Sequence, residues 1–293
     1  MDREETQDEV KLITQPDDGA NPVTKAIDKA RKAIDIVIFR FDRSDIEKAL
    51  HDAVKRGVVV RALIAHTNKG GEKNLRKLEL RLLDAGVTVA RTADDLTRYH
   101  GKMMIVDNTT LHVYGFNYTK LDIDKSRSFG IVTRDRRLVS EAIKLFEADA
   151  LRQTYSPSHR RLVVSPENSR AVLTDFIKGA RQQLLIYDAQ VSDNAIQKVL
   201  QERADAGVEI RIIGTLEKSL SGVKVRKLSD QRLHVRAIIR DAREAFIGSQ
   251  SLRRLELEGR REVGVIIKNG GIVRRIQAVF EADWRKKSRK KAA

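Results

Sequence analysis

The segment that begins at Tyr99 carries polar side chains whose types and spacing suit phosphate chemistry. It reads Y-H-G-K-M-M-I-V-D-N-T-T-L-H-V-Y-G-F-N, with His100, Lys102, Asp107 and Asn117 at successive spacings of 2, 5 and 10. Residues two apart in a strand face the same side, so the imidazole of His100 and the ammonium of Lys102 are expected to project together. This arrangement places a nucleophile or base beside a fixed cation, as the cleavage of a phosphodiester requires.

A second segment repeats the pattern in the carboxyl-terminal half. It reads L-H-V-R-A-I-I-R-D-A-R-E-A-F-I-G-S-Q-S and places His234, Arg236 and Asp241 at the same spacings, with Ser249 after them and Glu262 further along. Two histidines in one cationic pocket push each other's pKa values apart. One imidazole can then stay neutral and attack while the other stays protonated and donates. A carboxylate bonded to ring Nδ1 would fix one tautomer.

The two segments belong to a repeat that spans nearly the whole chain. Matching residues lie 150 positions apart early in the repeat and 134 positions apart later; in the first copy they are Ala30-Arg31, Gly57-Val58 and Arg61, and then His100, Asp107, Arg127, Gly130 and Phe146–Asp149. The second copy is therefore shorter, and it lacks part of the region Lys69–Gly86. Such self-similarity predicts two copies of one structural unit.

The paired segments resemble the duplicated HxKxxxxD motif of the phospholipase D superfamily. The resemblance implies covalent catalysis, in which one histidine attacks phosphorus and the other protonates the leaving group and then activates water or an alcohol. We expect His100, whose motif is intact, to be the nucleophile and His234 to be the general acid and base. The mechanism needs no metal, and we expect no cofactor.

The resemblance also assigns roles to the neighbouring polar residues. Lys102 and Arg236 are expected to hold the phosphate oxygens. Asn117 is expected to donate a hydrogen bond to the phosphate, and Ser249 matches the Ser of the family's Gly-Ser pair. Glu262 matches the family's orienting acid, and the spacing leaves open which imidazole it holds.

Three positions depart from the family pattern. Arg236 replaces the usual Lys, which keeps the charge but changes the shape of the phosphate ligand. Ser128 stands where the first repeat would carry its orienting acid, and Ser251 where the second would carry Asn. The first repeat thus lacks the orienting acid and the second lacks the Asn, which suits a single site shared by both repeats. Asp107 and Asp241 are expected to brace hairpins or pair with Arg rather than to act in the chemistry.

Each repeat alternates predicted strands and helices, with a hairpin around Asp107-Asn108 in the first. We therefore predict an α/β fold of two tandem phospholipase D-like repeats, each a mixed, mostly parallel sheet flanked by helices, packed as a pseudo-twofold pair. The expected organisation is a disordered amino terminus at 1–9, repeats at 10–151 and 161–284, a linker at 152–160 between them, and a basic tail at 285–293.

The charge balance indicates an anionic partner. The chain has 293 residues and a formal net charge of +16. A field of that sign attracts nucleic acid, phospholipid headgroups and acidic bilayers. Aromatic residues make up 5% of the chain, which gives few stacking platforms for single-stranded bases. The basic run Trp284–Lys291 is a candidate handle for an anionic membrane surface.

The composition also bounds the location of the protein. Cysteine is absent, which excludes disulfides and thiolate metal sites. The amino terminus is acidic and polar, unlike a signal peptide, and no stretch approaches the roughly 18 apolar residues of a membrane span. We expect a cytoplasmic monomer, peripheral at the membrane if the basic tail binds there.

The leading hypothesis is a metal-independent phosphodiesterase of the phospholipase D type that hydrolyses or transfers a phosphatidyl group. The first alternative is an endonuclease or another nucleic-acid phosphodiesterase, favoured by the net charge and the basic tail. The second alternative is a non-catalytic phosphate-binding module with a degenerate second motif, suggested by Arg236, Ser128 and Ser251.

Overall fold

The computed structural model describes residues 10–66 and 72–286. The amino terminus that the sequence predicts to be disordered, and most of the predicted basic tail, lie outside these ranges. The first half contains β1 (Val10–Gln15), α1 (Asn21–Lys29), β2 (Ala33–Ile38), α2 (Ser44–Lys55), β3 (Val59–Ile64), α3 (Glu72–Asp84), β4 (Thr88–Arg91), β5 (Arg98–Tyr99), β6 (Met103–Val106), β7 (Thr110–Tyr114), α4 (Lys120–Lys125), β8 (Ser126–Thr133) and α5 (Arg136–Ala150).

The second half repeats much of this order. It contains β9 (Leu162–Ser165), α6 (Ser169–Lys178), β10 (Gln183–Val191), α7 (Asn194–Asp205), β11 (Glu209–Leu216), β12 (Val223–Arg226), β13 (Arg232–Leu233), β14 (Ala237–Arg240), β15 (Glu244–Gly248), α8 (Arg254–Glu258), β16 (Arg260–Ile267) and α9 (Gly270–Arg285). Within the described part of the chain, no helix links β11 to β12 as α3 links β3 to β4. The missing helix accounts for the shorter second repeat.

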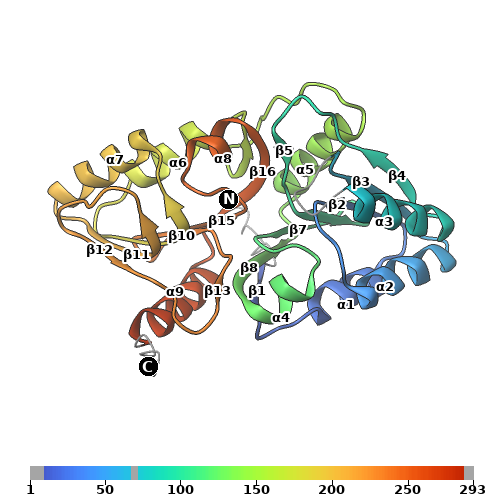
Figure 1. The fold of residues 1–293 in the computed structure, drawn as a ribbon, viewed down its shortest axis with the longest axis horizontal. Helices are drawn as coiled ribbons and strands as arrows, with labels where there is room; N and C mark the ends of the chain where they lie inside the picture. Colours follow the sequence, from blue (N-terminus) through green and yellow to red (C-terminus); the bar gives the residue numbers. More distant parts are fainter. Residues whose placement is uncertain (1–9, 67–71, 287–293) are drawn as a thin grey trace, which may run out of the picture.

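Each half builds a mixed sheet, and the two sheets meet at the centre of the molecule, where β7 and β8 lie beside β15 and β16 (Figure 1). The first sheet has the order β1-β8-β7-β6-β2-β3-β4, and the second runs β12-β11-β10-β14-β15-β16 with β9 also on β16. The predicted pair of phospholipase D-like α/β halves, each a mixed sheet with flanking helices, is confirmed.

The expected parallel majority within each sheet is wrong. The strands β2, β3 and β4 run parallel because α2 and α3 carry the chain back between them. Tight turns join β6 to β7 and β14 to β15, so these pairs run antiparallel. The pairs β7–β8 and β15–β16 also run antiparallel, with the short helices α4 and α8 in their connections. Antiparallel pairs therefore outnumber parallel ones in both sheets of the described chain.

The hairpin between β6 and β7 turns at Asp107 and Asn108, whose φ angles are 53° and 54°. The Asp107 carboxylate accepts hydrogen bonds from the backbone N–H groups of Arg31, Lys32 and Ala33, which ties the turn to the start of β2.

The second half repeats this hairpin. Asp241 and Ala242 have φ angles of 52° and 54°, and the Asp241 carboxylate accepts from the backbone of residues 181–183. Each aspartate thus ties its hairpin turn to a backbone segment that lies much earlier in the sequence.

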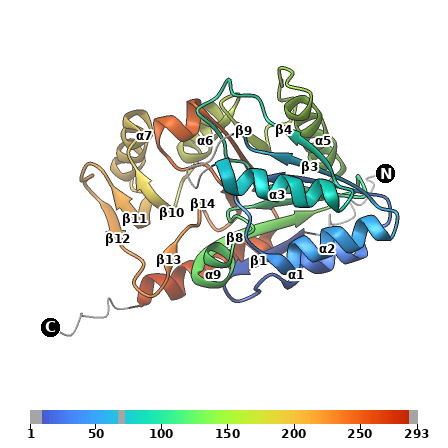
Figure 2. The ribbon, with the colours of Figure 1, turned by 45° about the vertical axis from the view of Figure 1, so that its right-hand side comes forward.

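Three large apolar clusters of the described residues hold the layers together. The helices α1, α2 and α3 cover the outer face of the first sheet, with Ile27, Leu50 and Leu78 buried against Ile36 (Figure 2). The helices α6, α7 and α8 pack in the same way on the second sheet. The third cluster takes residues from both halves and includes the buried faces of α5 and α9. The halves therefore share a core, which fixes their relative position.

Buried ion pairs also cross between the halves in a symmetric way. Arg127 on β8 donates to Asp283 on α9 at 2.9 Å, and its repeat counterpart Arg261 on β16 donates to Asp149 on α5 at 3.1 Å. All four side chains are buried. The terminal helix of each half is thus fastened to a strand of the other half.

The halves also exchange their shortest strands. The strand β5 pairs in parallel with β16 of the second half, and β13 pairs in parallel with β8 of the first. The backbone N–H of His100 donates to the carbonyl of Arg261 at 2.7 Å, and that of His234 to the carbonyl of Arg127 at 3.1 Å. Each motif histidine is therefore held by a strand of the opposite half.

Candidate active site

Both motif histidines open into one cavity of about 330 Å³. The predicted site residues that line it are His100, His234, Arg236, Asn117, Ser249 and Glu262, and the other lining residues are Phe39, Arg40, Arg98, Arg232, Arg253, Glu256 and Arg260. The strand exchange explains this convergence, because each histidine follows directly on a strand that pairs with the opposite half. Residues from both repeats thus form a single polar site.

Glu262 holds the imidazole of His100. Oε2 of Glu262 lies 2.8 Å from Nδ1 of His100, and the carboxylate is completely buried. The parallel pairing of β5 with β16 sets Tyr99 beside Arg261, so the next residue on each strand is His100 and Glu262. This contact settles which imidazole the acid orients. With Nδ1 occupied, the ring presents Nε2 as its free nitrogen.

The ring of Phe39 supports the same imidazole from another side. The two ring centres lie 4.5 Å apart at an interplanar angle of 73°, an edge-to-face contact. Burial, followed by the charges of Lys102 and Arg236, lowers the pKa of His100 well below its usual value. The structure therefore favours a neutral imidazole at this position.

His234 faces a different acid, which the sequence analysis missed. The pairing of β13 with β8 sets His234 beside Ser128, which has no carboxylate to offer. Asp122 on α4 takes this place, with Oδ2 at 3.6 Å from Nδ1 of His234, an ion-pair distance longer than a hydrogen bond. The repeat offset contained a signal for this residue, because Asp122 aligns with the second half's acidic Glu256.

The pKa of His234 is also displaced. Burial lowers it, the negative charge of Asp122 acts to raise it, and Arg236 lowers it again, so that the result lies well below the usual value. Asp122 itself is buried and accepts hydrogen bonds from Asn117 and Arg232. Its carboxylate is therefore fixed beside the ring that it influences.

The two motif cations occupy matching positions behind their histidines. Nζ of Lys102 donates to the carbonyl oxygen of His100, and Nη1 of Arg236 donates to that of His234 at 2.9 Å. Arg236 also lines the cavity, whereas Lys102 is fully buried and does not line it. Burial lowers the pKa of Lys102 to about 7. Lys102 thus stands one layer further from the cavity than its predicted role as a phosphate ligand suggests.

The remaining predicted residues divide between the cavity and its supports. Asn117 lines the cavity, and one of its two side-chain N–H groups donates to Asp122 at 2.6 Å. The hydroxyl of Ser249 accepts from the backbone N–H of Val263 at 3.1 Å. Ser251, which takes the place of an Asn in the second repeat, donates to the buried carboxylate of Asp188.

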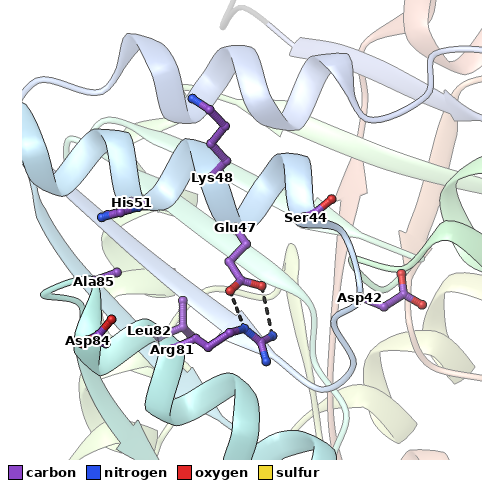
Figure 3. Close-up of a pocket in the computed structure, with 9 residues that line it drawn as sticks. All are labelled: Asp42, Ser44, Glu47, Lys48, His51, Arg81, Leu82, Asp84 and Ala85. Carbon is purple, nitrogen blue, oxygen red and sulfur yellow. Dashed lines mark hydrogen bonds and ion pairs between the residues drawn. The ribbon is translucent and has the colours of Figure 1, made fainter.

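A larger surface cavity lies elsewhere, between α2 and α3 (Figure 3). It measures about 590 Å³ and contains an ion pair between Glu47 and Arg81, with Nε and Oε1 2.6 Å apart. None of the motif residues lines it within the described ranges. We place the active site in the smaller cavity because the paired histidines and their acids converge there.

Family comparison agrees with the geometry of this cavity. The family model described as "Cardiolipin synthase, PLD-like domain" matches residues 23–150 and 173–284, one segment in each half. The chain belongs to this phospholipase D-like family. None of the curated proteins matches the sequence.

Solved structures share the fold of this phospholipase D-like chain. Polyphosphate kinase from Porphyromonas gingivalis has a TM-score of 0.78 at 20% identity over 97% of this chain, which spans about half (53%) of the kinase's length. Phosphatidylserine synthase from Haemophilus influenzae Rd KW20 has a TM-score of 0.71 at 11% identity, over 94% of this chain and 86% of its own. The phospholipase D family member Nuc from Salmonella typhimurium matches 50% of this chain and 96% of its own, at 26% identity and a TM-score of 0.45.

Two further observations concern the part of the phospholipase D-like chain that the structure describes. No helix there is both long enough and apolar enough to cross a bilayer. No group of three or more His, Cys, Asp or Glu side chains in those residues is arranged to hold a metal ion.

Proposed function

We propose that this protein is a phosphodiesterase that acts without a metal ion through a phosphohistidine on His100. The observation that carries the proposal is the buried contact between Glu262 and Nδ1 of His100, in a cavity that His234 shares. Glu262 orients the ring so that Nε2 is free to attack. Its negative charge also stabilises the positive charge that the ring acquires when it bonds to phosphorus.

The reaction has two displacements at phosphorus. In the first, Nε2 of His100 forms a bond to phosphorus, the bond from phosphorus to the leaving oxygen breaks, and His234 gives that oxygen a proton. In the second, His234 takes a proton from water or an alcohol, whose oxygen attacks phosphorus while the P–N bond breaks. Both histidines then regain their starting states. The guanidinium of Arg236 stabilises the charge on the phosphoryl oxygens.

The two environments suit these unlike roles. His100 sits against Phe39 among cations, which favours the neutral form that attacks. Asp122 opposes the other influences on His234 and favours the protonated form that donates. The negative charge of a bound phosphodiester raises the pKa of both imidazoles, as Asp122 does for His234.

Turnover of bis(4-nitrophenyl) phosphate in excess EDTA tests the proposal. We expect hydrolysis to continue in EDTA and to be lost in His100→Ala. With so good a leaving group, His234→Ala should still form the adduct but hydrolyse it slowly, so an acid-labile phosphoryl group should accumulate on His100 and be located by mass spectrometry. Loss of turnover in EDTA would contradict the metal-free mechanism. An adduct that accumulates on His234 in His100→Ala, with none on His100 in His234→Ala, would reverse the roles, and no turnover at all would favour a phosphate-binding module.

The substrate class has two candidates. The sequence favours a phosphatidyl group, and a phosphatidylserine synthase is among the proteins that share this fold. The lining of the cavity favours nucleic acid, because Phe39 is the one apolar side chain among the described residues that line it. Release of a headgroup from phospholipid vesicles, measured beside cleavage of plasmid DNA, separates the two.

A further inference from the structure

The arginines that line the active-site cavity are neutralised unequally in the two halves. On the side of His234, Arg232 donates to Asp122 at 2.6 Å. Its repeat counterpart Arg98 lies on the side of His100, and no carboxylate in residues 10–66 or 72–286 forms an ion pair with it. The acid that aligns with Asp122 is Glu256, which binds Arg260 at 2.7 Å and also Arg253.

Arg40 adds a second cation on the same side. It lines the cavity, and no carboxylate in the described parts of the chain pairs with it. Its Nε is buried and has no hydrogen-bond partner among those residues. The repeat places the neutral, exposed Gln190 at the equivalent position of the second half. The excess positive charge is thus a property of the His100 side.

Phe39 holds both guanidinium groups next to the proposed nucleophile. The guanidinium carbons of Arg40 and Arg98 lie 5.5 Å and 5.6 Å from the centre of its ring, and the same ring contacts His100. These contacts are of the cation–π type. Burial, followed by the charges of Arg260 and Arg40, lowers the pKa of Arg98. The cations therefore repel one another, and an anion bound between them would relieve that repulsion.

The charge balance of the cavity exceeds what one phosphodiester supplies. Among the described residues, six arginines line it, whereas the carboxylates that line it are those of Glu256 and Glu262. Asp122 does not line the cavity but pairs with Arg232, which does. A phosphodiester carries a single negative charge. Because burying unpaired charge is costly, a ligand that fits this lining has to bring further negative charge.

We propose that Arg40 and Arg98 form a second anion subsite beside His100, which selects substrates that carry a second phosphate group close to the scissile phosphodiester. The proposal rests on the phosphodiesterase function proposed above. Arg98 also lines a neighbouring cavity of about 320 Å³ together with Thr92 and Thr97. A chain that leaves the second phosphate has room to continue there.

A binding measurement tests the subsite independently of turnover. Isothermal titration calorimetry at fixed ionic strength compares tripolyphosphate with orthophosphate. We expect the wild type to bind tripolyphosphate at least about tenfold more tightly, because each charge-assisted hydrogen bond contributes that order of affinity. The double variant Arg40→Gln/Arg98→Gln should lose most of this ratio. Arg243→Gln, which removes one positive charge from an exposed hairpin turn, should keep it. Equal binding of the two anions by the wild type, or an unchanged ratio in the double variant, would overturn the proposal.

The rates of hydrolysis of two matched chromogenic substrates test the subsite during catalysis. Thymidine 5′-(4-nitrophenyl phosphate) is compared with the same compound bearing a 3′-phosphate. We expect kcat/KM to be at least about tenfold higher for the second compound. Arg98→Lys should retain part of the preference, whereas in the double variant the ratio of the two kcat/KM values should fall to about one. If neither compound is hydrolysed, the proposed function fails while the calorimetry still decides the subsite.

A lipid arm separates the two sources of a second phosphate. Mixed detergent micelles present either cardiolipin, with two phosphates, or phosphatidylglycerol, with one. The rate of hydrolysis of each lipid is measured for the wild type and the double variant. If the wild type hydrolyses cardiolipin faster, if this difference depends on Arg40 and Arg98, and if the 3′-phosphorylated nucleotide is not preferred, the second phosphate belongs to a lipid. The reverse result would assign it to a soluble phosphate chain. Absence of any preference in both pairs would contradict the proposal.

Discussion

Nδ1 of His100 lies 2.8 Å from Oε2 of Glu262, although 162 residues separate the two along the chain. They meet because β5 and β16 pair in parallel across the halves, so His100 and Glu262 come directly after the paired residues Tyr99 and Arg261. Burial raises the pKa of Glu262, and the positive charge of Lys102 acts to lower it. Glu262 is thus the acid that holds the proposed nucleophile in position.

Replacement of Glu262 tests this relationship. In Glu262→Gln, the amide oxygen can still accept from Nδ1–H, but the charge that stabilises the phosphorylated ring is gone. We expect kcat to fall on the order of 100-fold or more, with KM changed little, because the lost interaction acts mainly in the transition state. Steady-state kinetics with bis(4-nitrophenyl) phosphate measure the effect. Glu258→Gln, an exposed acid on α8, is the control, and a folded Glu262→Gln variant with wild-type kcat would show that the carboxylate is dispensable.

Asp122 should control the protonation of His234. Its carboxylate acts to raise the pKa of that ring, so Asp122→Asn lowers it. The alkaline limb of the kcat profile, where His234 loses the proton that it donates, should therefore move to lower pH. A purely structural loss would reduce kcat without moving the limb. Asp122→Glu should restore part of the shift, and thermal melting checks that both variants remain folded.

The hairpin aspartates should stabilise the fold in a pH-dependent way. Burial acts to raise the pKa of Asp107, but hydrogen bonds from the backbone of residues 31–33 outweigh it and leave the pKa lowered; Asp241 behaves in the same way. A folded pKa below the unfolded value means stabilisation that is complete above about pH 4 and is lost as the pH falls through the folded value.

Substitution of these aspartates provides the measurement. Asp107→Asn and Asp241→Asn should each lower the free energy of unfolding by about 1–3 kcal/mol at pH 7, and by much less near pH 3. Urea unfolding at both pH values measures the difference, with the exposed Asp28→Asn as the control. An equal loss at both pH values would contradict the predicted linkage.

The repeat supplies a matched test of strain in the hairpin turns. Asn108 and Ala242 occupy the same turn position, each with φ of 54°. Asn tolerates this left-handed conformation better than Ala. Ala242→Asn should therefore raise the free energy of unfolding by about 0.5–1 kcal/mol, and Asn108→Ala should lower it by a similar amount. Urea midpoints measure both changes, and shifts of the same sign in the two variants would refute the explanation.

Much of the site could be predicted from the sequence because its chemistry lies in short, repeated spacings. The motif places Lys102 two residues after His100, and the repeat places Arg236 two residues after His234. The predicted strand alternation is wrong, because residues 100–102 and 234–236 connect strands and Lys102 does not line the cavity with His100. The same repeat predicted two α/β halves and a shorter second copy. These features depend on local periodicity and on residue identity, both of which can be read directly from the chain.

The tertiary structure decided how the halves complete each other. Glu262 serves His100 rather than His234 because β5 pairs with β16, and Asp122 stands beside His234 because α4 brings a carboxylate to where Ser128 offers none. The direction of the strands was also decided by the tertiary structure, because β7–β8 and β15–β16 run antiparallel although their connections contain α4 and α8. Contacts of this kind join residues more than a hundred positions apart, and spacing along the chain carries no information about which distant strands will pair.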